Sequence, residues 1–281
     1  LDESALLINM SHTHGGANVN TQLGDKPGGE LVAPYLDRLV AEISSAIDEA
    51  RERAAPAWIT YGYGRCALAA NRDYWAPDLG RYVCGYNPAG PADDTLLVAR
   101  ATADDGATIA TLINYACHPT TLAWQNRLLS PDYIGAAREL LAGIYGAPCL
   151  FLYGAAGELG PREGFVGDPA VADRNGRQLG YASAAAIEAL PPPAARLVYT
   201  GVVPSGANLA TWEYGPLDPA AEARCARLEA GITPVPLRRK ASLTAVDPPG
   251  ADGGDPAAEA EKAMRRTFIQ AALGDDPVHQ M

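Results

Sequence analysis

Two short apolar runs in this chain end at histidines, and they constrain the fold more than any other feature of the sequence. The first run, residues 6–10, is followed by a serine, by His-Thr-His at positions 12–14 and by two glycines. Side chains alternate between the faces of a strand, so a strand that continued this far would place His12 and His14 on the same face. The second run, residues 113–117, leads directly to His118 and then to a proline, which takes the chain out of a sheet.

Imidazoles at the ends of two buried strands suit a metal ion. Neutral imidazole nitrogen is a common ligand of zinc, and imidazole can also polarise a carbonyl group. A pair of solvated loop histidines explains the His-Thr-His tripeptide equally well by itself. A lone histidine such as His118 is more often a core residue with satisfied hydrogen bonds. The chain has only 4 histidines, however, so three of them at predicted strand ends favour convergence on one metal.

The composition is that of a globular protein, and it excludes some partners. Of the 281 residues, 48% are hydrophobic and 20% are charged, and the net charge is -11. This charge opposes a nucleic-acid partner, because phosphates are neutralised by clustered Lys and Arg. No apolar run approaches the roughly 20 residues of a transmembrane segment. The 5 cysteines include no Cys-x-x-Cys pair, so we expect small buried side chains rather than disulfides or a zinc ribbon.

The periodicity of the sequence predicts an α/β fold in which mixed β-sheets are layered with α-helices. Helices are predicted over residues 33–54, 131–145 and 170–190, with Ser130 as the N-cap of the second. The aspartate that follows, Asp132, is expected to be a first-turn carboxylate that favours the helix dipole. Residues 80–94 are predicted to be a loop. Strands are predicted at residues 58–63, 66–70, 95–102, 108–117, 149–153 and 197–203, with a hairpin turn at Asp-Asp-Gly 104–106.

A single catalytic domain is predicted over residues 1–281, incomplete at both ends. From residue 216 onward the composition turns to Ala, Glu, Arg and Pro. We expect helices at 220–230 and 256–273, joined by a linker at 247–255 that is rich in Pro, Asp and Gly. The stretch 216–281 is therefore predicted to be a helical excursion on the domain.

Four segments together resemble the neutral ceramidase family, in particular its smaller bacterial members. They are Ser-His-Thr-His-Gly-Gly at 11–16, Ala-Asn-Arg at 70–72, Asn-Tyr-Ala-Cys-His-Pro-Thr at 114–120 and the glycine-rich loop at 154–161. Their order and approximate spacing also match, so the resemblance covers most of residues 1–190. It implies an α/β catalytic domain that binds one zinc ion (Zn2+). It also implies hydrolysis of the amide bond of N-acylsphingosine or a related lipid or small-molecule amide.

The resemblance implies roles for individual residues. His12 and His118 correspond to zinc ligands, His14 to a residue that faces the reacting amide, and Arg72 to a further site residue. The family completes its zinc shell with a Glu and a Tyr from further along the chain, which implies additional ligands after Met281.

The loop after the predicted strand 149–153 adds candidates from its own chemistry. Glu158 is suited to carry a proton to the leaving amine, as His14 is. The small residues Gly157 and Gly160 allow the backbone to approach a substrate closely.

One position departs from the family pattern. The family carries a serine within Gly-Asp-x-Ser-Pro-Asn beside its metal, whereas residues 157–162 read Gly-Glu-Leu-Gly-Pro-Arg. Gly160 stands at the serine position, so hydrolysis by a metal-activated water without a hydroxyl partner is expected. This departure favours an alternative, a non-catalytic relative that keeps the fold and the metal site as a binding or structural module. A TIM-barrel amidohydrolase also opens with His-x-His, but it needs further histidines and a regular βα repeat.

Overall fold

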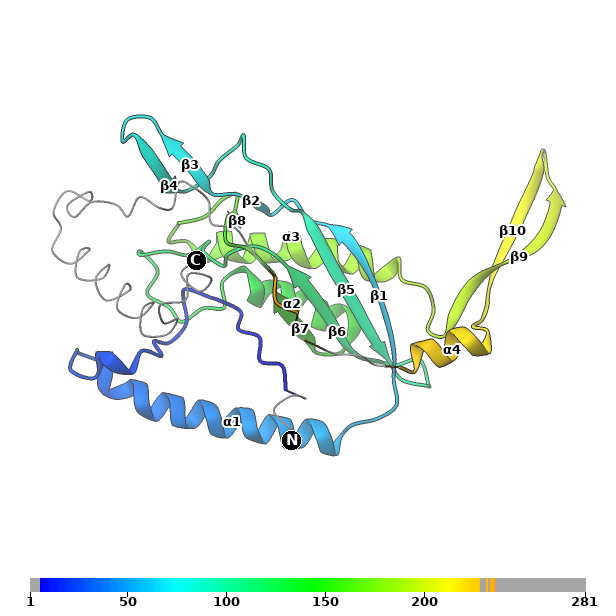
Figure 1. The fold of residues 1–281 in the computed structure, drawn as a ribbon, viewed down its shortest axis with the longest axis horizontal. Coiled ribbons are helices and arrows are strands. Elements are labelled where there is room, and N and C mark those ends of the chain that lie inside the picture. The colour runs from blue at the N-terminus through cyan, green and yellow to red at the C-terminus, as the bar shows by residue number, and fades with distance from the viewer. Residues whose placement is uncertain (1–5, 228–230, 232, 236–281) are drawn as a thin grey trace. The chain divides into compact units, whose positions relative to one another are not determined.

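The structure is a computed structural model that describes residues 6–227, 231 and 233–235 (Figure 1). The chain divides into two compact units, Leu1–Glu222 and Ala223–Met281. The described residues form mixed β-sheets and four α-helices, which confirms the predicted α/β class. The predicted linker at 247–255 and helix at 256–273 lie outside the described residues. None of the described helices combines the length and the apolarity that crossing a bilayer requires.

The largest sheet has the strand order β1-β5-β6-β7 (Figure 1). The strands β1 (Trp58–Arg65), β5 (Thr95–Thr102) and β6 (Thr108–Tyr115) are antiparallel neighbours. The edge strand β7 (Cys149–Tyr153) runs parallel to β6. The predicted hairpin between β5 and β6 is confirmed, with Gly106 at φ 87 in its turn, a conformation that glycine adopts without steric cost.

Two helices cover one face of this sheet. Helix α2 (Tyr133–Tyr145) and helix α3 (Pro169–Glu188) pack against each other and against the strands (Figure 1). Because α2 connects β6 to the parallel strand β7, these three elements form a β-α-β unit. The carboxyl ends of β6 and β7 therefore lie at the same edge of the sheet, which is where α/β proteins commonly place ligand sites.

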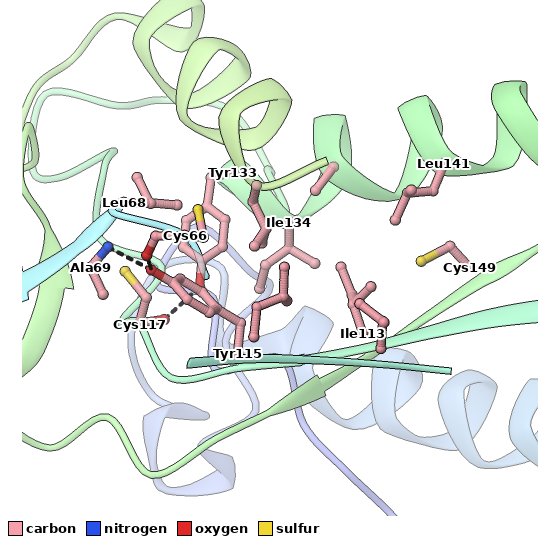
Figure 2. Packing of buried hydrophobic residues seen from close by; sticks show 14 of the residues in the cluster. Cys66, Leu68, Ala69, Ile113, Tyr115, Cys117, Tyr133, Ile134, Leu141 and Cys149 are labelled. Carbon is pink, nitrogen blue, oxygen red and sulfur yellow. Dashed lines mark hydrogen bonds between the residues drawn. The ribbon is translucent and has the colours of Figure 1, made fainter. Parts of the chain in front are cut away.

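The core between sheet and helices continues to this edge. Figure 2 shows buried residues of this core from β6, α2 and β7, among them Tyr115, whose side chain is fully buried. The hydroxyl of Tyr115 donates to the carbonyl of Cys66 at 2.6 Å and accepts from the amide of Ala69 at 2.8 Å. These two hydrogen bonds tie the carboxyl end of β6 to the chain that enters β2 (Ala69–Asn71). Core packing thus fixes the segments that border the candidate site.

The start of α2 differs from the prediction. The N-cap is Asp132 rather than Ser130, and the side chain of Asp132 accepts a hydrogen bond from the amide of Tyr133. Asp132 has φ 56 and ψ -149, outside the helical region, so the helix begins only at Tyr133. The expectation that Asp132 is a first-turn carboxylate was therefore wrong.

Three two-stranded sheets complete the described structure, and sequence reasoning found them only in part. Strand β2 pairs with β8 (Leu159–Pro161), and β3 (Asp73–Ala76) pairs with β4 (Arg81–Cys84). The prediction of a continuous loop over 80–94 was wrong, because β4 lies within it. The predicted strand at 197–203 is confirmed as β9 (Ala195–Pro204). It pairs with β10 (Asn208–Pro216), which was not predicted.

Helix α1 (Val32–Glu52) confirms the helix predicted over 33–54, whereas α4 (Pro219–Cys225) is shorter than predicted. Two short 3-10 helices, η2 (Thr21–Leu23) and η3 (Gly29–Leu31), precede α1.

Two other expectations were wrong. Residues 6–10 do not pair with a neighbouring strand and therefore form no strand. Leu7, which was expected to be buried in that strand, is 83% exposed. The side chain of Asn9 instead accepts one hydrogen bond from the amide of Tyr153 at 2.9 Å. Cys84 and Cys225 are exposed, although the remaining cysteines are buried as expected.

Candidate metal centre

The candidate metal centre lies just past the carboxyl ends of β6 and β7. His118 follows β6 closely and is 8% exposed. Its amide donates to the carbonyl of Leu159 at 3.0 Å, which joins the segment after β6 to strand β8. The preceding residue, Cys117, accepts a hydrogen bond from the buried hydroxyl of Tyr133 at 2.5 Å. The position of His118 is therefore set by main-chain contacts on both sides.

The hydrogen bonds of the His118 ring decide which nitrogen can bind a metal. Nδ1 lies 2.6 Å from the carbonyl oxygen of Ala156 and 3.2 Å from that of Leu159. A carbonyl only accepts, so Nδ1 carries the proton and Nε2 of the neutral ring carries the lone pair. Burial, and then the positive charge of Arg72, lower the pKa of His118 to about 4. The ring is thus neutral at pH 7, as a zinc ligand must be.

His12 and His14 reach the same place on an irregular loop. His12 has φ 61, the left-handed region, so the two side chains converge through a turn and not by alternation along a strand. The loop is held by Ser130, whose carbonyl accepts from the hydroxyl of Thr13 at 2.7 Å. The amide of Ser130 donates to the carbonyl of Gly15 at 2.9 Å. Both histidines are exposed, in contrast to His118.

The three histidines have a spacing that fits a metal ion. Their candidate ligand atoms all lie within 4.8 Å of one another. Nε2 of His12 is 3.1 Å from Nε2 of His118. Two nitrogens at about 2.0–2.1 Å from a tetrahedral zinc ion lie about 3.3 Å apart. The His12–His118 pair is therefore already at ligand spacing, with His14 beside it.

The other predicted site residues gather around Arg72 and the β2–β8 pair. The amide of Arg72 donates to the carbonyl of Glu158 at 2.9 Å, and its Nε donates to the carbonyl of Gly157 at 3.0 Å. Gly160 pairs with Ala70 in this small sheet. A Cβ atom at Gly160 would meet the Arg72 side chain at 3.6 Å, an ordinary contact, so the backbone there has room for a side chain. The side chain of Glu158 is exposed.

Two further residues of the site were missed by sequence reasoning. The ring of Tyr153 stacks on His12 with centroids 5.1 Å apart, and its hydroxyl is 3.2 Å from Nδ1 of His118. Thr120 lines a cleft of about 840 Å³ together with His14. Most of the larger side chains in the other walls of the cleft are apolar, namely Leu122, Ala123, Trp124, Leu128, Leu129 and Phe165, and Asn126 and Arg127 add polar groups. Tyr153 ends a predicted strand just before a glycine, and His118 was likewise identified as a side chain at a strand end, although before a proline.

The carboxylate of Asp132 connects helix α2 to the segment that follows His118, and its removal is expected to destabilise the protein. Its carboxylate is buried and accepts from the amides of Tyr133 at 2.7 Å and Leu122 at 2.8 Å. Its own amide donates to the hydroxyl of Ser130 at 3.0 Å. Asp132→Ala removes the helix cap and leaves the amide of Leu122 unpaired, so we expect a loss of about 2–4 kcal/mol in the free energy of unfolding.

Urea unfolding measures this loss, and Asp132→Asn is the matched control because the amide keeps one acceptor oxygen. The asparagine variant should lose less stability than the alanine variant. Equal stability of the alanine variant and the unmodified protein would contradict a stabilising role for the carboxylate.

Comparison with known proteins gives structural likenesses alone. No protein-family model matches the chain, and no curated protein matches it. The neutral ceramidase from Pseudomonas aeruginosa is similar to it in structure, with a TM-score of 0.45 and 19% sequence identity. A ceramidase complexed with C2 has a TM-score of 0.42 and 19% identity. The alignment with the first structure covers 54% of this chain and 26% of the ceramidase chain. The alignment with the second covers 50% of this chain and 24% of that chain.

Proposed function

We propose that this chain carries the zinc site of a hydrolase that cleaves the amide bond of an N-acyl lipid or a related N-acyl substrate. The observation that carries the proposal is the facing pair of nitrogens, Nε2 of His12 and Nε2 of His118, 3.1 Å apart. The carbonyl of Ala156 supports this role, because it keeps the proton of His118 on the opposite nitrogen. His12 and His118 are the zinc ligands in this proposal.

The remaining roles follow from the chemistry of the surrounding residues. Zinc held by this pair would polarise the amide carbonyl and lower the pKa of a water molecule to about 7. His14 lines the cleft, and in this proposal it is the residue that faces the amide. Arg72, anchored through Nε on Gly157, and His14 are the candidates to stabilise negative charge on the carbonyl oxygen. Glu158 is a candidate to bring the proton to the leaving amine.

The step that we propose is direct hydrolysis. The oxygen of water forms a bond to the carbonyl carbon, the carbon–nitrogen bond breaks, and the amine leaves with a proton. Gly157 and Gly160 contribute backbone and space for the substrate. Because Gly160 offers no side-chain oxygen, we expect no covalent acyl-enzyme at this position.

We expect the full-length protein to release fatty acid from an N-acyl amide only when zinc is bound. The test strips the protein with a chelator, restores one equivalent of zinc and measures fatty acid by mass spectrometry, with N-acylsphingosine and a simple fatty-acyl amide as substrates. Loss of activity on stripping and recovery with zinc are the expected results. Zinc-loaded protein that turns over neither substrate, or an acyl-enzyme trapped on the protein, would overturn the proposal.

A non-catalytic metal-binding relative is the second candidate, and Gly160 is the observation that favours it. Nothing in the local packing demands glycine, since a Cβ would make only ordinary contacts with Arg72 and Thr120. Zinc binding without turnover would favour this candidate. Gly160→Ser is an informative variant here, because the added hydroxyl would restore the residue of the family pattern. If Gly160→Ser hydrolyses the substrate and the unmodified protein does not, the chain is a catalytic scaffold that lacks the serine hydroxyl.

A further inference from the structure

Thr120 carries a hydroxyl group that the folded chain leaves without a partner. The residue is 5% exposed, and its Oγ1 atom is buried with no hydrogen-bond partner among the described residues. A buried hydroxyl that has lost its water and gained no partner costs stability, so such a group needs an explanation. The neighbouring Thr121 differs, because its hydroxyl accepts from the side chain of Asn175 at 3.1 Å.

The main chain holds Thr120 in place. Its amide donates to the carbonyl of His118 at 2.9 Å, and its carbonyl accepts from the amide of Phe165 at 2.9 Å. Both main-chain groups are thus occupied, and the residue is fixed within a tight turn directly after a candidate zinc ligand. The side-chain hydroxyl is the polar group of Thr120 that remains for a ligand.

The hydroxyl lies close to Gly160. A Cβ atom built on Gly160 would be 3.9 Å from Oγ1 of Thr120 and 3.6 Å from Cδ of Arg72. Thr120 and Arg72 therefore both lie within van der Waals distance of the position that a side chain at Gly160 would take. Thr120 also lines the cleft together with His14. A substrate amide that faces His14 and Arg72 would come close to this hydroxyl.

We propose that Thr120 is a substrate-contacting residue whose hydroxyl forms a hydrogen bond with the scissile amide, where the cleft passes Gly160. The inference rests on the proposed amide hydrolase function and adds one group to it. A hydroxyl both donates and accepts, so it suits an amide, which offers one acceptor and one donor. The residue acts by holding the amide in line with the attacking water and does not bind the metal.

The test compares Thr120→Val, Thr120→Ser and Thr102→Val in the full-length protein. Valine keeps the shape of threonine and removes the hydroxyl, while serine keeps the hydroxyl. Thr102 is the matched control, since it is also buried with an unpartnered Oγ1 but lies at the other end of β5 from the site. Three quantities are measured for each variant: kcat/KM on a fatty-acyl amide, zinc affinity and melting temperature.

We expect Thr120→Val to lower kcat/KM by about 10–100-fold while zinc affinity stays unchanged and the melting temperature does not fall. Thr120→Ser should stay within about threefold of the unmodified protein, and Thr102→Val should not lower activity. Unchanged kcat/KM in Thr120→Val, an equal loss in Thr120→Ser, or a parallel loss of zinc affinity would each overturn the inference. An unmodified protein that hydrolyses no N-acyl amide would instead refute the proposed function, and this inference with it.

Discussion

Replacing His118 by alanine is expected to lower zinc affinity by more than about 100-fold and to abolish hydrolysis. The loss of a residue that merely orients a ligand typically costs about 10–100-fold in metal affinity, and the loss of a ligand costs more. His118 is the buried half of the facing pair, and its Nδ1 is held by the carbonyl of Ala156. The variant would leave His12 with no facing imidazole at 3.1 Å.

Isothermal titration with zinc measures the affinity, and a thermal melt without metal verifies that the variant is folded. His14→Ala is the matched control, because His14 belongs to the same cluster and is proposed to face the substrate. We expect this variant to keep one zinc equivalent and to lose activity. If His14→Ala loses zinc as fully as His118→Ala, His14 is a third ligand and its proposed catalytic role is wrong. Full zinc affinity in His118→Ala would refute the site itself.

Gly176→Ala is expected to cause the largest loss of stability, at about 3 kcal/mol or more. Gly176 lies on α3 where this helix crosses α2. A Cβ there would lie 2.3 Å from the carbonyl oxygen of Tyr133 and 3.0 Å from the amide nitrogen of Ala137. Both are main-chain atoms of α2 and cannot rotate away as a side chain would, so the two helices would have to separate.

The matched control is Gly143→Ala on the exposed side of α2. A Cβ at Gly143 meets nothing within 4 Å, so this variant should gain about 0.5–1 kcal/mol from the higher helix propensity of alanine. Differential scanning calorimetry should then give a melting temperature lower by about 6–12 °C for Gly176→Ala and slightly higher for Gly143→Ala. A Gly176→Ala variant as stable as the unmodified protein would show that the helices tolerate a wider crossing.

The sequence was sufficient to predict the elements with strong local patterns. The hairpin of β5 and β6 has alternating side chains around an Asp-Gly turn, and α1 has an unbroken apolar periodicity, so both were predicted within a few residues. The approach of His12 to His118 was also predicted, and their 3.1 Å separation confirms it. For His118 the prediction succeeded because the end of a buried strand is a fixed point at the edge of a sheet. The strand predicted to carry His12 is absent, and His12 reaches His118 on an irregular loop instead.

The features that were missed depend on contacts between distant parts of the chain. Asp132 adopts φ 56 because its carboxylate binds the amide of Leu122 and its amide binds Ser130, and no local pattern encodes that pair of contacts. The short strands β3 and β4 have four residues each, too few for a clear alternation. The unpartnered hydroxyl of Thr120 is equally invisible in the sequence, where Thr120 and Thr121 look alike.

The two halves of the candidate centre are attached to the protein with different strength. His118 sits between main-chain hydrogen bonds and the core, whereas the loop of His12 is tied to Ser130 by two hydrogen bonds. A metal ion shared by both would therefore act as a cross-link, closing a ring of chain from residue 12 to residue 118. Its escape would be governed by the opening of the exposed histidine loop, and the lifetime of the bound ion would be a property of that loop more than of the buried imidazole.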